Sequence, residues 1–184
     1  MTTRDLSVLE GLDPEAVKEA VMVLRRESDR GAILVAIAIL DDVFTNRLTQ
    51  LLDRGNSEAR SRILSPPLGA LSSFSSKVDL AFCIGIIPKQ IYDDIRLVNK
   101  LRNLCAHDWG AFRITQDILV KFIQPMVMKK AIDAANSVKP IFFPAGTSPK
   151  DVLVSTLAGL VTFVNLYRPL PHGAVTTTLG DSIV

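Results

Sequence analysis

Two residues near the middle of the chain, Arg102 and His107, are of types that carry chemistry. They belong to the segment KLRNLCAHDWG (residues 100–110), which also contains the only Trp of the chain, one of its two Cys and one of its two His. A guanidinium keeps its charge in any surroundings and needs carboxylates, carbonyls or a ligand as partners, whereas an imidazole exchanges a proton near neutral pH. The pair is therefore either a functional site or the polar end of a helix.

Helical spacing places Arg102 on an apolar face. A helix is expected from Pro88 to about His107, because proline is favoured at the start of a helix and Asp108 and Gly110 are typical after its end. Its apolar positions recur at intervals of four, three and seven residues: Ile91, Ile95, Val98 and Cys105. Arg102 follows two of them by seven and four residues. We therefore expect a buried guanidinium that is either satisfied by a salt bridge or points into a cavity with a ligand.

The acid that would pair with Arg102 is expected at the flanks of a long apolar helix. Glu27, Asp29 and Asp41 are the candidates, because the apolar run between them must lie against the face that carries Arg102. The alternative is ordinary solvated charge, in which Glu27 pairs with Arg30 three residues away on the same helix.

The orientation of His107 depends on where its helix ends. His107 follows Arg102 by five residues, which is about 140° around a continuous helix. If the helix ends at Ala106, the chain can turn and bring the imidazole beside the guanidinium. If the helix continues, His107 is a surface residue near a helix C-terminus, where a cation is favoured.

The elements that position these residues are all predicted to be helical. A length of 184 residues, with 48% hydrophobic and 22% charged side chains, fits a single-domain bundle of about five to seven helices. Residues 31–40 are apolar almost all round, so their helix is expected at the centre of the bundle. Residues 1–139 are predicted to form the core, and residues 140–184 a linker, one further helix and a mobile tail on the same domain. The helices are expected over residues 13–55 with a possible break at 28–31, in a short piece before Pro66, and over 73–84, 88–107, 117–137 with an interruption at Pro125, and 149–167.

Composition excludes several classes of function. The formal net charge is only +2, from 21 basic and 19 acidic side chains, so no global field favours nucleic acid. The two Cys have no metal-ligand spacing, and no phosphate-binding loop or dinucleotide motif is present, so we expect neither a metal nor a cofactor. The apolar runs are shorter than a membrane span, and the N-terminus lacks the apolar region of a signal peptide. A cytoplasmic protein is expected.

The segment RNLCAH resembles the R-x4-H motif of HEPN-type all-α domains, many of which are metal-independent ribonucleases. The resemblance implies that Arg102 would neutralise phosphate and Asn103 would orient it. His107 would act as acid or base on the RNA 2′-hydroxyl and the leaving oxygen. In that family, dimerisation commonly brings two copies of the motif together.

A longer part of the chain, from Leu24 to Phe112, resembles the mannitol operon repressor (MtlR)-like family. The resemblance lies in RRESDRGAILVAIAILDDVF and GALSSFSSKVDLAFCIGIIPKQIYDDIRLVNKLRNLCAH, in that order. It implies an all-α, repressor-like regulator. The segment KVDLAFCIGIIPKQIYDDIR partly fits helix-turn-helix spacing, but Asp93 and Asp94 oppose approach to phosphates, so direct DNA binding is weakly supported.

Our leading prediction is a non-enzymatic transcriptional regulator that acts mainly through contacts with a protein partner. Self-association is also expected, because the last helix is rich in apolar residues. The alternative is a HEPN-type ribonuclease that binds RNA and uses Arg102, Asn103 and His107. The residues predicted to serve binding are charged: Glu27, Asp29, Arg30, Asp41, Lys77 and Asp79.

Overall fold

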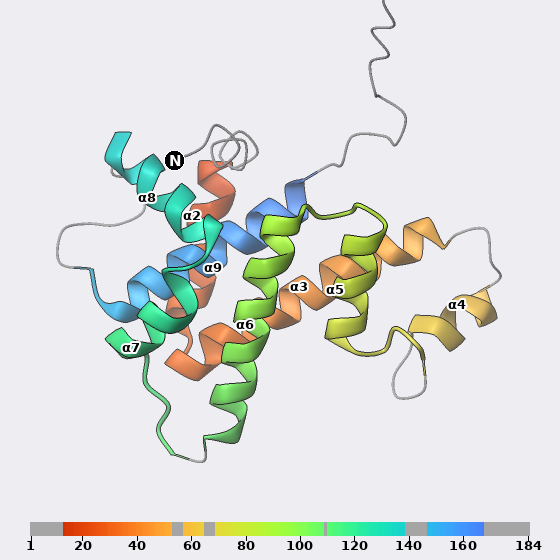
Figure 1. Cartoon of the computed structure of the whole chain (residues 1–184), viewed down its shortest axis with the longest axis horizontal. Coiled ribbons are helices and arrows are strands. Elements are labelled where there is room, and N and C mark those ends of the chain that lie inside the picture. The colour runs from red at the N-terminus through yellow and green to blue at the C-terminus, as the bar shows by residue number, and fades with distance from the viewer. Residues whose placement is uncertain (1–12, 53–56, 65–68, 109, 139–146, 168–184) are drawn as a thin grey trace, which may run out of the picture.

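The computed structural model describes residues 13–52, 57–64, 69–108, 110–138 and 147–167, and these form an all-α bundle (Figure 1). The predicted fold class is confirmed, and no strand occurs among these residues. In chain order the elements are α2 (Pro14–Arg26), α3 (Asp29–Leu51), α4 (Ser57–Leu64), α5 (Phe74–Cys83), α6 (Lys89–His107), α7 (Gln116–Ile118), the π-helical turn η2 (Leu119–Ile123), α8 (Val127–Val138) and α9 (Pro149–Leu166).

Capping residues set the helix boundaries. Ser28, Ser73 and Ser148 each precede a helix, and each side chain accepts a hydrogen bond from the backbone N–H three residues later. Ser28 therefore confirms the predicted break, which separates α2 from α3. Gly85 has a φ of 76°, a left-handed conformation that favours glycine, and it lets the chain turn from α5 into α6.

Helix α9 is the centre of the bundle. Every residue from Leu153 to Val164 is buried, and α2, α3, α8 and η2 pack around the helix. Figure 1 shows α9 crossing the middle of the molecule, with α7 and α8 toward one end and α4 and α5 toward the other. A Cβ at Gly159 would lie 2.9 Å from Cδ1 of Ile132 and 3.0 Å from Sδ of Met128, so glycine permits the close approach of α8.

Helix α3 packs against α2, α4, α5, α6 and α9, as expected for a helix at the centre of the bundle, but one edge of it is open to solvent. Leu34 is 38% exposed and Ala38 is also exposed, whereas Ile33 and Ile37 are buried. The apolar residues of α9, which motivated the prediction of self-association, are buried within the chain itself. Hydropathy alone does not distinguish burial inside one chain from burial between chains.

A buried carboxylate of another helix caps the start of α8. Asp94 of α6 is 2% exposed and accepts hydrogen bonds from the backbone N–H groups of Val127 at 3.0 Å and Met128 at 2.8 Å. These are groups that a helix start leaves without partners inside the helix. Burial raises the pKa of Asp94 from its ordinary value of 3.8 to about 6, against the two hydrogen bonds, which lower it.

Among the described residues, none of the helices has the length and hydropathy of a membrane span. The predicted division at residue 139 falls in a segment, 139–146, that lies outside the described residues, as does the predicted tail, 168–184. The division therefore stays a prediction, although α9 itself is an integral part of the bundle.

The raised pKa of Asp94 predicts a pH-dependent stability. The folded chain holds this proton more tightly than the unfolded chain, so the stabilisation is complete below about pH 3.8 and lost as the pH rises through about 6. Relative to Asp94→Asn, the free energy of unfolding of the native chain should fall by about 3 kcal/mol across this window. Urea unfolding of both proteins from pH 4 to pH 7 measures it, and a difference that does not change with pH would contradict the assignment.

Candidate binding groove at Arg102

Arg102 lines an open groove between α3, α5 and α6, which we call the Arg102 groove. It has a volume of about 590 Å³, within the range of ligand-binding sites. Three segments form its walls: Leu34, Ile37, Ala38 and Asp41 of α3; Ser72, Ser73, Phe74 and Ser75 at the start of α5; and Asn99, Arg102 and Asn103 of α6.

The prediction that Arg102 is buried is wrong. Helix α5 lies along this side of α6 as far as Asn99, whose side-chain amide donates a hydrogen bond to Ser75 Oγ at 3.0 Å. Because α5 begins at Phe74, it does not cover the next turn of α6, and Arg102 is exposed there. Helical spacing therefore predicts the direction of Arg102 correctly, but not the length of the helix beside it.

The proposed ion pair between Arg102 and an acid near α3 is also absent among the described residues. The guanidinium donates one hydrogen bond to Asn103 Oδ1, at 3.2 Å. Asp41 lines the same groove but forms an ion pair with Lys77 Nζ at 2.8 Å. Asp29 accepts a hydrogen bond from a backbone N–H in the loop after α6. The positive charge of Arg102 is therefore left facing the groove.

Lys77 is a nearby cation that, unlike Arg102, is buried and paired with a carboxylate. Its side chain is 5% exposed, whereas that of its partner Asp41 is 35% exposed. A buried ammonium needs a nearby negative charge, so Asp41 is committed to Lys77. Because this pair is neutral, Arg102 gives the groove a net positive charge.

His107 does not line the Arg102 groove. Helix α6 continues through His107, and Asp108 is its C-cap, so the chain does not turn at Ala106. His107 consequently lies about 140° around the helix from Arg102. The structure brings Arg102 and Asn103 together on the groove, while His107 is exposed beyond it.

Three other predicted binding residues hold the end of the bundle together. Arg30 donates hydrogen bonds to two backbone carbonyls of the loop after α6. Lys150 of α9 donates to the backbone carbonyl of Glu27, and its Nζ lies 3.9 Å from Asp29 Oδ1. Glu27, Asp29 and Arg30 thus serve the junction between α3, α9 and the loop after α6, and none of them lines the groove.

Asp79 lies on the outer surface of α5 and α6. It accepts hydrogen bonds from Tyr92 Oη at 2.9 Å and from Arg96 at 3.3 Å, and Lys89 pairs with Asp93 on the same helix. Lys89 and Arg96 are cations that a DNA-reading helix would offer to phosphates. Since both are paired with carboxylates of this chain, the charge pattern does not favour DNA binding by α6.

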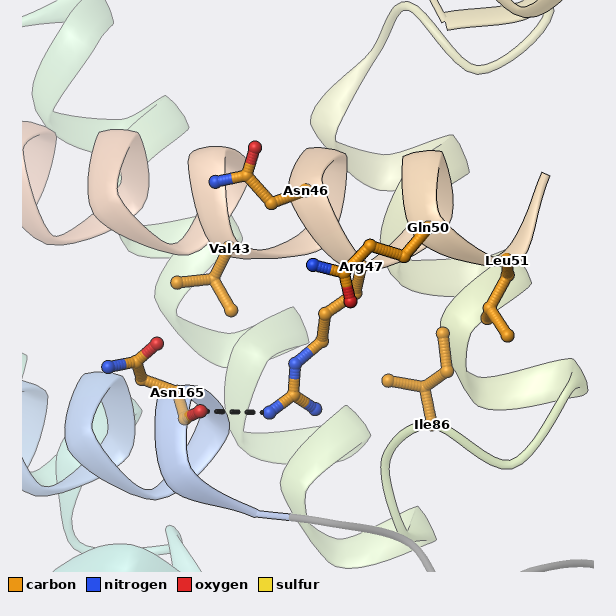
Figure 2. A pocket seen from close by; sticks show the side chains of 7 residues that line it. All are labelled: Val43, Asn46, Arg47, Gln50, Leu51, Ile86 and Asn165. Carbon is orange, nitrogen blue, oxygen red and sulfur yellow. Dashed lines mark hydrogen bonds between the residues drawn. The ribbon is translucent and has the colours of Figure 1, made fainter. Parts of the chain in front are cut away.

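A second hollow lies at the other end of α3, where Arg47 meets the end of α9 (Figure 2). The guanidinium donates hydrogen bonds to the backbone carbonyls of Asn165 at 3.0 Å and Tyr167 at 2.7 Å. Carbonyls at a helix end lack partners inside the helix, so Arg47 caps α9. The guanidinium in this hollow therefore has a structural role, the capping of a helix, whereas the guanidinium of Arg102 caps no helix in the described residues.

Metal-binding side chains do not gather in the described part of the chain. No group of three or more His, Cys, Asp or Glu there is arranged to hold an ion. Cys83 is exposed and Cys105 is buried, and both thiols are free. The groove itself presents one guanidinium, one carboxylate that is paired with Lys77, and amide, hydroxyl and apolar groups.

Comparison with solved structures finds a chain of similar fold. No protein-family model and no curated protein matches the sequence. The structure is similar to a chain of the X-ray structure of the MtlR–HPr complex from Escherichia coli, with a TM-score of 0.63, 18% identity, and coverage of 83% of this chain and 99% of that one. The fold is MtlR-like. The part of the prediction that concerns the MtlR-like fold is thereby confirmed, whereas the HEPN resemblance stays a prediction.

The different surroundings of Arg102 and Lys77 predict different costs of substitution. Arg102→Gln should change the free energy of unfolding by less than about 0.5 kcal/mol, because an exposed side chain without an ion pair contributes little. Lys77→Gln should cost about 2 kcal/mol, because it removes one member of a largely buried pair. Chemical denaturation of both variants measures this contrast. A large loss in Arg102→Gln would show that the guanidinium is part of the core.

Proposed function

We propose that this chain is a non-enzymatic regulator that acts by binding a partner protein. The observation that carries the proposal is the unpaired Arg102 in an open groove whose floor includes exposed apolar side chains of α3. Protein interfaces commonly combine an apolar centre with a polar rim, and they are enriched in arginine. The MtlR-like fold supports the proposal, because the similar chain comes from a complex with HPr.

The groove is poorly equipped for proton transfer. Its one carboxylate, Asp41, is held by Lys77, and its imidazole candidate, His107, lies on another face of α6. General acid and base catalysis needs a titrating group within hydrogen-bonding reach of the substrate. Binding is therefore the simpler use of this set of side chains.

The regulated process in this proposal is transcription, as the resemblance to an operon repressor family implies. The proposed location is the cytoplasm, which fits free Cys83 and Cys105 thiols. Contact with DNA would be indirect, because Lys89 and Arg96 are paired with carboxylates of the same chain. Self-association is a further part of the proposal, and sedimentation of the purified chain tests it.

The first partner to test is HPr from the organism that makes this chain. We expect saturable binding in isothermal titration, with a dissociation constant on the order of 10 µM or tighter, as is usual for regulatory encounters. A control protein of similar size and net charge should give no binding. Absence of binding by HPr at concentrations on the order of 1 mM would overturn HPr as the partner.

The ribonuclease alternative predicts a different outcome in a direct assay. Because His107 does not share the groove with Arg102, we expect no cleavage when the purified chain is incubated with single-stranded RNA in EDTA. His107→Ala is the matched control for a contaminating nuclease. Cleavage by the native chain that disappears in His107→Ala would establish the enzyme and refute the non-enzymatic proposal.

A further inference from the structure

We infer that the Arg102 groove receives an acidic segment of a partner protein, in which a carboxylate side chain lies beside an apolar one. The inference rests on the proposed function in taking the ligand to be a protein. It goes further by assigning the surface and the chemistry of the segment that binds there.

The charge of the groove selects a carboxylate. Arg102 has no ion pair among the described residues, and Asp41, the carboxylate of the groove, is neutralised by Lys77. A guanidinium binds a carboxylate through two parallel hydrogen bonds, which makes it a specific receptor for Asp or Glu. Asn103 lies on the same wall and accepts a hydrogen bond from the guanidinium, which restricts the orientation of the Arg102 side chain.

The floor of the groove selects an apolar neighbour for that carboxylate. Leu34 and Ala38 lie one turn apart on α3, and both are exposed, with Leu34 at 38%. Phe74 extends this apolar surface at the start of α5. Covering these side chains removes apolar surface from water, which favours association. A segment that carries both side-chain types therefore matches the groove better than either type alone.

The same features argue against two other ligands. Binding of nucleic acid needs several cations along the phosphate backbone, whereas Arg102 is the one cation among the described residues that line the groove. A small free anion would be poorly enclosed, because Arg102, Asn103 and Leu34 are all exposed to solvent, whereas small-ligand sites bury most of their ligand.

A synthetic peptide tests the inference on the intact chain. The probe is a 12-residue peptide with four Glu and two Leu in a Gly and Ser background, and its control has Lys in place of Glu. Binding is followed by NMR, through the Arg102 Nε–H signal and the side-chain amide signals of Asn99 and Asn103. We expect saturable shifts with the Glu peptide and none with the Lys peptide. Arg102→Gln should weaken binding at least about tenfold, because it removes the charge that meets the carboxylate.

Lys100→Gln is the matched variant, because it removes the same charge from an exposed position on another side of α6. It should bind the Glu peptide like the native chain. Leu34→Ser should also weaken binding, because it removes an exposed apolar side chain from the floor, and unchanged binding by this variant would overturn the apolar half of the inference.

Several results would overturn the inference. These are an absence of shifts with the Glu peptide, equal losses in Arg102→Gln and Lys100→Gln, or the same shifts with inorganic phosphate alone, which would assign the groove to a small anion. Because the probe is a peptide, a failure of HPr to bind leaves this test intact, so the two proposals fail separately.

Discussion

The burial of α9 on all sides is the constraint on which the rest of the structure depends. Twelve consecutive residues, Leu153 to Val164, are enclosed by α2, α3, α8 and η2, and Gly159 allows α8 to approach closely. Helix α3 therefore turns one face toward α9 and the other toward α5 and α6. The Arg102 groove lies on this second face, at the place where the short helix α5 begins and leaves the end of α6 uncovered.

Polar side chains secure this arrangement at the junctions between helices. Asp94 caps α8, Arg47 caps α9, and Arg30 holds the loop that follows α6. Lys77 and Asp41 join α5 to α3 through a largely buried ion pair. Each of these charged groups has a partner inside the chain. Arg102 differs from them because its charge faces solvent in a groove, and this difference is the reason to assign it a ligand.

The sequence alone predicts most of the secondary structure, because capping residues such as Ser28, Ser73 and Ser148 act locally. It also predicts the direction of Arg102, which follows from helical spacing. It does not predict the exposure of Arg102, because that depends on where a neighbouring helix begins in space. For the same reason it does not predict the exposed edge of α3 at Leu34 and Ala38. It also does not reveal Asp94 as a cap, because α8 lies more than thirty residues further along the chain.

The central claim, that residue 102 lies open to a ligand, can be measured by thiol reactivity. Arg102→Cys in a Cys83→Ser background leaves Cys105 as the other thiol, and Cys105 is buried. Reaction with a maleimide reports access of solvent to the thiol. The account predicts labelling at a rate close to that of Ala106→Cys, an exposed position on the same helix. Labelling as slow as that of Cys105 would show that position 102 is enclosed in the core and would contradict the account.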